Sequence, residues 1–166
     1  MKNDDIVITS AFRTAIGTFR GSLKGMQAHD LGALTIEAVM QKSNLNPNDV
    51  DELIMGQVLT SATGQNPARQ AAILAKMPVE KTAYVINQVC GSGLRSVAAG
   101  YQAIMCNDSK IIIAGGQESM TNAPHAIYFR DGEKLDEAKL IDTMIKDGLW
   151  DAFNGYHMGV TAENVA

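Results

Sequence analysis

Residues 87–95 read Asn-Gln-Val-Cys-Gly-Ser-Gly-Leu-Arg, and they join two segments of different pattern. Before them, residues 83–86 form an uninterrupted apolar run that indicates a buried strand. After them, apolar side chains recur at helical spacing from Leu94 to Met105. The pattern therefore predicts a strand-to-helix turn, with Cys90 at or just before the N-terminus of the helix.

That position gives Cys90 the surroundings of a nucleophile. The unpaired N–H groups and the dipole at a helix N-terminus stabilise negative charge and so favour a thiolate. Gly91 and Gly93 leave room for a substrate to approach. The same N–H groups are suited to bind the oxyanion that forms when a thiolate attacks a carbonyl group. A lone cysteine also fits the part of a small buried residue, so this segment alone leaves both interpretations open.

The composition is that of an ordinary globular protein. The chain has 166 residues, of which 46% are hydrophobic and 19% charged, enough for one domain with a proper core. The net charge is −4 and no run of Lys or Arg occurs, so we expect neither nucleic acid nor a membrane as partner. No apolar stretch is long enough to span a bilayer, and residues 1–5 resemble neither a signal nor a transit peptide. We expect a cytoplasmic protein.

The cysteine and histidine residues are scattered along the chain. They lack the paired spacing of a zinc site, so we expect no metal. A disulfide between Cys90 and Cys106 is not expected, because the helix between them would hold them roughly 20 Å apart. We interpret Cys106 as structural, His29 and His125 as surface residues, and the dispersed carboxylates as solvated.

Predicted strands alternate with predicted helices. The strands are residues 5–11, 53–59, 83–86 and 110–114. Helices are expected to begin at Asp30 and at Asn66-Pro67, and a third follows Cys90. This alternation predicts an α/β fold with a mostly parallel sheet and helices on both faces. Active groups in such sheets lie at the carboxyl ends of strands, where Cys90 and Gly115-Gly116 both fall.

The pattern changes after the last predicted strand. We interpret residues 1–117 as an α/β unit that carries Cys90, and residues 118–166 as the start of a second region. Within that region, residues 118–138 are a polar excursion and residues 139–153 predict one amphipathic helix.

Longer motifs in the chain resemble those of the thiolases. The run Val85-x-Asn87-x-x-Cys90-Gly91-Ser92-Gly93-Leu94 is similar to the active-site motif of that family. Three further segments are similar to the family: residues 64–70, residues 115–125, and residues 142–166, which include Tyr156-His157-Met158-Gly159. The resemblance extends from near residue 6 to the last residue and is closest to the biosynthetic, short-chain branch. It covers less than half of a thiolase.

The resemblance implies the layered α/β thiolase fold, a mostly parallel mixed sheet with helices on both faces, of which this chain is the N-terminal half. It also implies acyl transfer, in which two acetyl-CoA molecules give acetoacetyl-CoA and CoA, or the reverse thiolysis. Cys90 would be the nucleophile and carry the acetyl group. Leu149, His157 and Met158 would line the slot for the pantetheine arm and the acyl group. Coenzyme A thioesters would be substrates, with no bound cofactor. Family members are homo-oligomers, dimers or tetramers, and act in fatty acid metabolism.

The family's second catalytic cysteine, its catalytic histidine and its catalytic asparagine come from the C-terminal half and have no counterpart in residues 1–166. We therefore expect this chain alone to be incomplete and inactive without that half. Two alternatives stay open. One is a non-catalytic chain that only binds a thiolase subunit. The other is a papain-like cysteine hydrolase, which also places Cys-Gly-Ser at a helix start, although here Gly93-Leu94 replaces the usual second cysteine and aromatic residue.

Overall fold

A three-stranded parallel sheet organises the computed structural model, which describes residues 5–130 and 139–166. The spatial order is β2-β1-β3, with β1 at Glu52–Gly56, β2 at Thr82–Ile86 and β3 at Ile112–Gly116. Gly56 pairs with Ile86 on one side and with Gly116 on the other, so the three strands end level. The carboxyl ends of all three therefore form one common edge.

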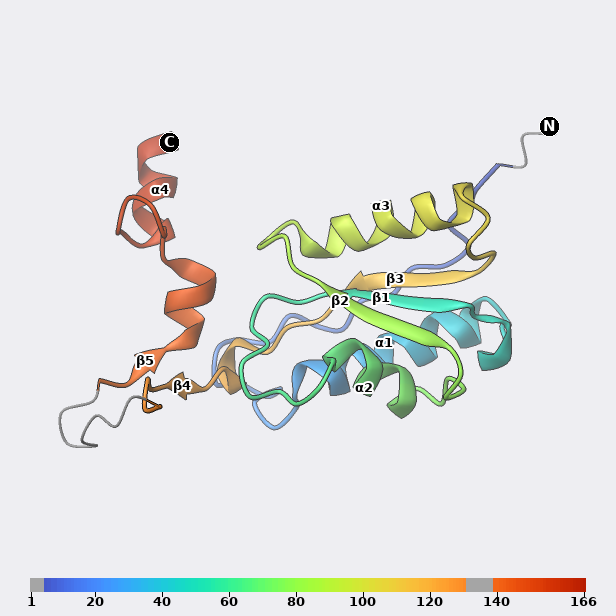
Figure 1. Ribbon diagram of the computed structural model, residues 1–166, viewed down its shortest axis with the longest axis horizontal. Helices are drawn as coiled ribbons and strands as arrows, with labels where there is room; N and C mark the ends of the chain where they lie inside the picture. Colours follow the sequence, from blue (N-terminus) through green and yellow to red (C-terminus); the bar gives the residue numbers. More distant parts are fainter. Residues whose placement is uncertain (1–4, 131–138) are drawn as a thin grey trace.

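Helices cover both faces of this sheet (Figure 1). Helices α1 (Ala28–Lys42) and α2 (Pro67–Leu74) pack together on one face, and α3 (Ser92–Met105) covers the other. The main core lies between β1, α1 and α2, and its members are all but fully buried: Ile36, Met40, Val50, Leu53, Met55, Ala68, Ala71 and Ala72. The predicted α/β architecture is confirmed.

Local capping explains where the helices begin. Asn66 accepts a hydrogen bond from the N–H of Arg69 through its side chain, and Pro67 occupies the first helical position, as the sequence predicts. In α1, the Asp30 carboxylate accepts from the N–H of Gln27, so Asp30 is the third helical residue and the helix begins at Ala28. A short 3₁₀ helix at Pro47–Asp49 follows Asn46 by the same cap-plus-proline signal.

The strand predicted over residues 5–11 does not form. These residues have no regular secondary structure, and Val7 and Ile8 are 69% and 79% exposed. A strand exists only through hydrogen bonds to a neighbour, and within residues 5–130 and 139–166 none pairs with this segment. The apolar run Ile6-Val7-Ile8 has β propensity, but propensity does not provide a neighbouring strand to pair with. The strand predicted over residues 5–11 is therefore wrong.

The chain after residue 117 is built from short elements. A 3₁₀ turn at Met120–Asn122 leads to β4 (His125–Ala126), which pairs antiparallel with β5 (Ile141–Asp142). A π-helical segment, η3 (Met144–Leu149), and helix α4 (Met158–Val165) follow. The division of the chain into 1–117 and 118–166 stays a prediction, and part of the polar excursion, residues 131–138, lies outside the described residues.

The amphipathic helix predicted over residues 139–153 is reduced to η3. Ile141 and Asp142 are taken up by pairing with β4, and the Asp142 carboxylate accepts hydrogen bonds from the N–H groups of Met144 and Ile145. At the other end, the Asp151 carboxylate folds the chain into a turn by accepting hydrogen bonds from the N–H groups of Phe153 and Asn154.

Among the described helices, none combines the length and the apolar character that crossing a membrane requires.

Candidate active site

Cys90 lies on the turn between β2 and α3, as the sequence predicts. Gly91 is the N-cap of α3 and Ser92 its first residue, so the cysteine stands two positions before the helix. Its side chain is exposed. In Figure 1 this turn is at the end of the sheet toward which β1, β2 and β3 all point, the usual place for active groups in parallel sheets.

The turn is sharp because one residue adopts an uncommon backbone conformation. Val89 has a φ of 48°, in the left-handed region that β-branched residues rarely enter. Side-chain and backbone groups hold it there. The N–H of Val89 donates to Oδ1 of Asn87 at 2.9 Å, and the N–H of Gly91 donates to the carbonyl oxygen of Gln88 at 3.0 Å. This conformation lifts Cys90 away from the strand and into solvent.

The N–H groups at the start of α3 are not all free to bind an oxyanion. Ser92 donates its N–H to the carbonyl oxygen of Val89 at 3.1 Å, and Gly91 is engaged with Gln88. For the N–H of Cys90, by contrast, no acceptor is found in the part of the chain that the structure describes. Cys90 therefore combines an exposed thiol with a backbone N–H that has no acceptor among the described residues.

Glycine residues allow α3 to start directly on the ends of two strands. A β carbon on Gly56, at the end of β1, would lie 2.4 Å from the carbonyl carbon of Ser92 and 2.6 Å from the nitrogen of Gly93. A β carbon on Gly116, at the end of β3, would lie 3.4 Å from the α carbon of Gly93. Larger residues at these positions would push the helix start away. No local sequence pattern points to Gly56, because the residues that it meets are distant in the chain.

A half-buried carboxylate, that of Glu118, supports the loop beside the turn. Oε2 of Glu118 accepts from the N–H of Val58 at 2.8 Å, and its Oε1 accepts from the N–H of Leu59 at 3.3 Å. Burial raises the pKa of Glu118, against the opposing effect of these backbone hydrogen bonds. Nδ2 of Asn87 lies 3.5 Å from the carbonyl oxygen of Val58, which connects this loop to the turn. Interpreting every carboxylate as solvated was wrong for Glu118.

The three residues expected to bind substrate lie together at the base of one loop. Trp150 and His157 form an isolated antiparallel bridge, so Leu149 and Met158 stand beside it on the two arms of the loop. His157 is the N-cap of α4, and its Nδ1 accepts from the N–H of Gly159 at 3.0 Å. Leu149 is half-buried, whereas His157 and Met158 are exposed. Among the described residues, no hydrogen bond joins this group to Cys90. In Figure 1, α4 and the β2–α3 turn both lie on the side toward which the strands point.

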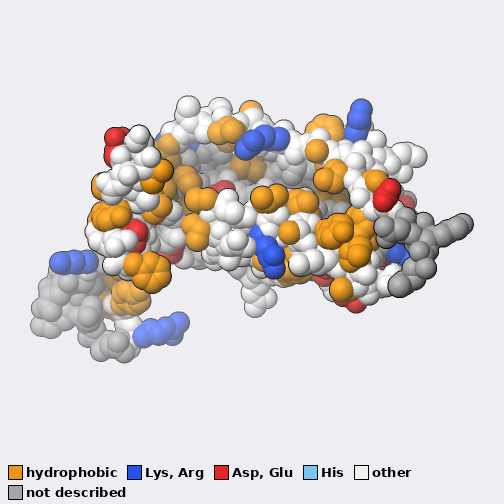
Figure 2. Space-filling view, turned by 90° about the horizontal axis from the view of Figure 1, so that it is seen from above, with side chains coloured by type: hydrophobic (Ala, Val, Ile, Leu, Met, Phe, Trp, Pro, Cys, Tyr) orange, Lys and Arg blue, Asp and Glu red, His pale blue; other side chains and the backbone are white. Residues whose placement is uncertain are grey.

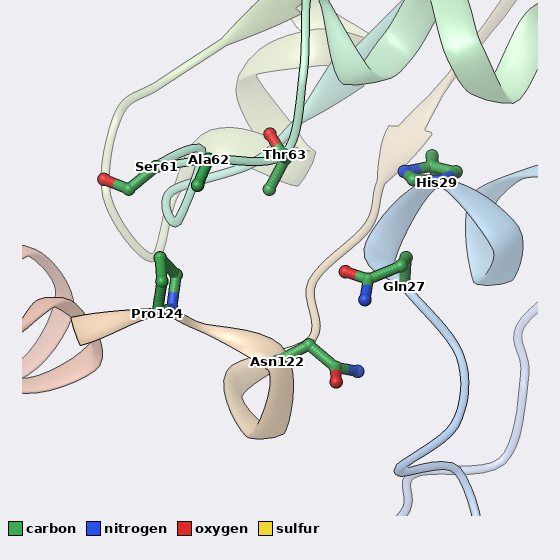
Figure 3. Close-up of a pocket in the computed structure, with 7 residues that line it drawn as sticks. All are labelled: Gln27, His29, Ser61, Ala62, Thr63, Asn122 and Pro124. Atoms are coloured by element: carbon green, nitrogen blue, oxygen red, sulfur yellow. The ribbon is translucent and has the colours of Figure 1, made fainter. Parts of the chain in front are cut away.

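The structure also contains a cavity that the candidate site residues do not line. The cavity is polar, has a volume of about 290 Å³ and is lined by residues at the start of α1, in the loop of residues 61–63 and around Asn122. Figure 3 shows these lining residues. His29, at the edge of the cavity, has a side chain only 18% exposed, so its interpretation as a surface residue was wrong. Across residues 5–130 and 139–166, no three His, Cys, Asp or Glu side chains gather as metal ligands would.

The sequence model of the thiolase N-terminal domain matches residues 6–166. The chain belongs to the thiolase family. The solved structure of the Acat5 thiolase from Ascaris suum in complex with coenzyme A agrees with the present fold. Its TM-score is 0.87 at 37% sequence identity, over 94% of this chain and 41% of that one. The thiolase fold expected from the motifs is thereby confirmed.

Curated thiolases resemble the chain more closely in sequence. The acetyl-CoA acetyltransferase of Paracoccus denitrificans is 58% identical over 160 residues, which are 96% of this chain and 41% of that protein. The acetyl-CoA acetyltransferase of Rhizobium meliloti (strain 1021) is 58% identical over 166 residues, all of this chain and 42% of that protein. The chain thus spans about two fifths of the length of these relatives.

Proposed function

We propose that this thiolase chain supplies the nucleophile of an acetyl-CoA acetyltransferase, the enzyme that condenses two acetyl-CoA molecules to acetoacetyl-CoA and CoA, or runs the reverse thiolysis. The observation that carries the proposal is the exposed Cys90 at the start of α3, in a chain 58% identical to two enzymes of that name. An exposed thiol beside a helix N-terminus is suited to attack a thioester.

The geometry of the turn supports the following first half-reaction. Sγ of Cys90, as a thiolate, forms a bond to the carbonyl carbon of acetyl-CoA. The bond from that carbon to the CoA sulfur breaks, and CoA leaves as a thiol after taking up the proton that the Cys90 thiol had lost. The free N–H of Cys90 is placed to donate to the oxygen of the tetrahedral intermediate. The acetyl group is then bound to Sγ of Cys90 as a thioester, which the carbanion of a second acetyl-CoA attacks.

The substrate-binding role of Leu149, His157 and Met158 is part of the same proposal. Their meeting at the base of the 150–157 loop supports it, because the loop then brings two apolar residues and an imidazole near one another. The coenzyme A bound to the Ascaris suum thiolase supports coenzyme A thioesters as the substrate class. We propose no other cofactor.

The second half-reaction needs proton transfer, for which we look to residues that a longer thiolase chain would add. We accordingly propose that residues 1–166 are not active by themselves. A homo-oligomer, a cytoplasmic location and a role in fatty acid metabolism complete the proposal. The alternative is a non-catalytic chain that only binds a thiolase subunit. It predicts that turnover does not depend on Cys90. Family membership leaves the papain-like alternative without support.

Loss of acetoacetyl-CoA absorbance in the presence of free CoA tests the proposal. Residues 1–166 are assayed alone and mixed with the C-terminal half of a thiolase. We expect no useful turnover alone, since a positioned acid or base is worth on the order of 10²–10⁴-fold. We expect turnover with the C-terminal half, abolished by Cys90→Ser and retained by Cys106→Ser. Turnover that survives Cys90→Ser would overturn the proposal.

A further inference from the structure

We propose that Ser92 is a positioning residue: its hydroxyl group holds Val89 in the left-handed conformation that presents Cys90 to substrate. The inference rests on the proposed function of Cys90 and adds a residue to it. Ser92 stands in the first turn of α3 and is 4% exposed, so its hydroxyl group is not placed to meet a substrate. Whatever it contributes to the reaction must pass through Val89 and Cys90.

The hydroxyl group of Ser92 makes hydrogen bonds to both ends of the dipeptide Gln88-Val89. The N–H of Gln88 donates to Oγ of Ser92 at 2.8 Å, and the same Oγ donates to the carbonyl oxygen of Val89 at 2.6 Å. The group thus acts as acceptor for the peptide that enters residues 88–89 and as donor to the peptide that leaves them. Both directions of its hydrogen bonding are used within the turn.

Packing does not explain the conformation of Val89. Its side chain is 52% exposed, so no core holds it, and its φ of 48° is unfavourable for a β-branched residue. Such a conformation persists only where the surroundings fix it. Of the contacts at this turn, the two made by Oγ of Ser92 close a ring around Gln88 and Val89, and Oδ1 of Asn87 adds one from the other side.

The position of Ser92 is itself fixed by its contact with Gly56, at the end of β1. Its backbone rests on Gly56, where a β carbon would come within 2.4 Å of the Ser92 carbonyl carbon and 2.7 Å of its β carbon. The hydroxyl group is therefore a fixed point on the end of β1 rather than a mobile side chain. Removing it should let Val89 relax toward negative φ and turn Cys90 away from the helix start.

Alkylation of the two thiols by iodoacetamide tests this without any need for turnover. In Ser92→Ala we expect Cys90 to react about tenfold more slowly, a factor in keeping with the loss of one or two hydrogen bonds. The reaction of Cys106 in the same molecules should not change. Both thiols are exposed in the folded chain, and unfolding would remove the effect of the helix ends from both. An unchanged rate at Cys106 therefore shows that the loss at Cys90 is confined to the turn.

Ser96→Ala is the matched control. Ser96 is one turn further along α3 and fully buried, and its Oγ lies 2.6 Å and 2.7 Å from the carbonyl oxygens of Gly93 and Gly115. It loses a comparable buried hydroxyl group but does not touch Val89, so we expect the rate ratio of the parent chain. Equal falls of the ratio in Ser92→Ala and Ser96→Ala would overturn the proposal.

Val89→Gly provides the second test, because glycine adopts positive φ without strain. In that background, adding Ser92→Ala should lower the Cys90 rate by less than about threefold. A fall as large as in the parent chain would overturn the proposal, and the double variant carries the test if Ser92→Ala alone does not fold. Failure of the proposed function would show separately, as turnover that does not depend on Cys90.

Discussion

Gly56 lies directly beneath Ser92, so the last residue of β1 touches the first residue of α3. A β carbon on Gly56 would stand 2.4 Å from the carbonyl carbon of Ser92, closer than atoms approach without a bond. The two residues are 36 positions apart in the chain. Through this contact the central strand, β1, sets how closely the start of α3 approaches the sheet. The contact therefore also sets the position of Cys90.

Gly56→Ala should therefore disturb the active site. The new methyl group meets backbone atoms that cannot rotate away, so we expect a loss of about 1–3 kcal/mol in the free energy of unfolding. We also expect slower alkylation of Cys90. Gly115→Ala is the control, because a β carbon there would find only Sδ of Met55 at 3.8 Å, an ordinary contact. Chemical denaturation measures both variants, and equal stability of the two would contradict the contact.

Cys90 should be alkylated faster than Cys106 near neutral pH. Both thiols are exposed, so access does not distinguish them. They lie at opposite ends of α3, with Cys90 before its N-terminus and Cys106 as its C-cap. A helix dipole stabilises negative charge on an attacking sulfur atom near the N-terminus and opposes it near the C-terminus, and the two effects together suggest a rate ratio of about 3–30. Peptide mass spectrometry over a time course gives both rates, and faster labelling of Cys106 would argue against a catalytic Cys90.

The outer face of α3 should make residues 1–166 associate. Its apolar side chains stand three or four positions apart and are 38–78% exposed: Leu94, Val97, Tyr101 and Met105. Figure 2 shows hydrophobic side chains gathered on the face of the molecule that α3 covers. Because apolar patches of this kind bind one another, we expect dimers or larger species in light scattering.

A double variant tests which surface causes that association. Leu94→Lys combined with Tyr101→Lys should shift the chain toward a monomer, since both side chains are more than half exposed. Phe153→Lys is the control, because Phe153 is 98% exposed but belongs to the loop before α4. A parent chain that is monomeric at all concentrations would contradict the prediction.

Asp51 should give the fold an acid-sensitive contribution. Its Oδ2 accepts from the N–H groups of Lys110 at 2.7 Å and Ile111 at 3.0 Å, and these bonds, with the charge of Lys81, hold the pKa of Asp51 below its ordinary 3.8. A lowered pKa stabilises the fold above the ordinary value, and this is lost as the pH falls through the lower one. Asp51→Asn should cost about 1 kcal/mol at pH 7, because the site is partly open to solvent.

That cost should shrink toward zero as the pH falls below the ordinary pKa of an aspartate. Urea denaturation of the parent chain and of Asp51→Asn between pH 2 and pH 7 would follow it. A difference in stability that is the same at every pH would show that the charge of Asp51 is not what matters.

Sequence patterns predicted what depends on neighbours in the chain. The turn at Cys90 was predictable because an apolar run changes to helical spacing within a few residues. The helix at Pro67 and the 3₁₀ turn at Pro47 were predictable because asparagine and proline carry the cap within adjacent positions. These signals depend on local backbone chemistry and need no knowledge of the rest of the fold.

What the sequence did not predict depends on distant partners. Residues 5–11 have strand propensity but no pairing partner, and the helical pattern of residues 139–153 is overridden by β4 and by the side chain of Asp151. Gly56 meets Ser92, and Glu118 meets Val58 sixty positions away, only once the sheet has formed. Single residues that act at such a distance leave no periodic pattern along the chain.

Peptide mass spectrometry tests directly whether Cys90 carries the acetyl group. Residues 1–166, mixed with the C-terminal half of a thiolase, are incubated with acetyl-CoA, quenched in acid and digested for peptide mass spectrometry. We predict one acetyl group on the peptide that contains Cys90, none on the peptide that contains Cys106, and loss of the label when free CoA is added. Turnover of acetoacetyl-CoA without any acetylated Cys90, or with the acetyl group on Cys106, would contradict this prediction.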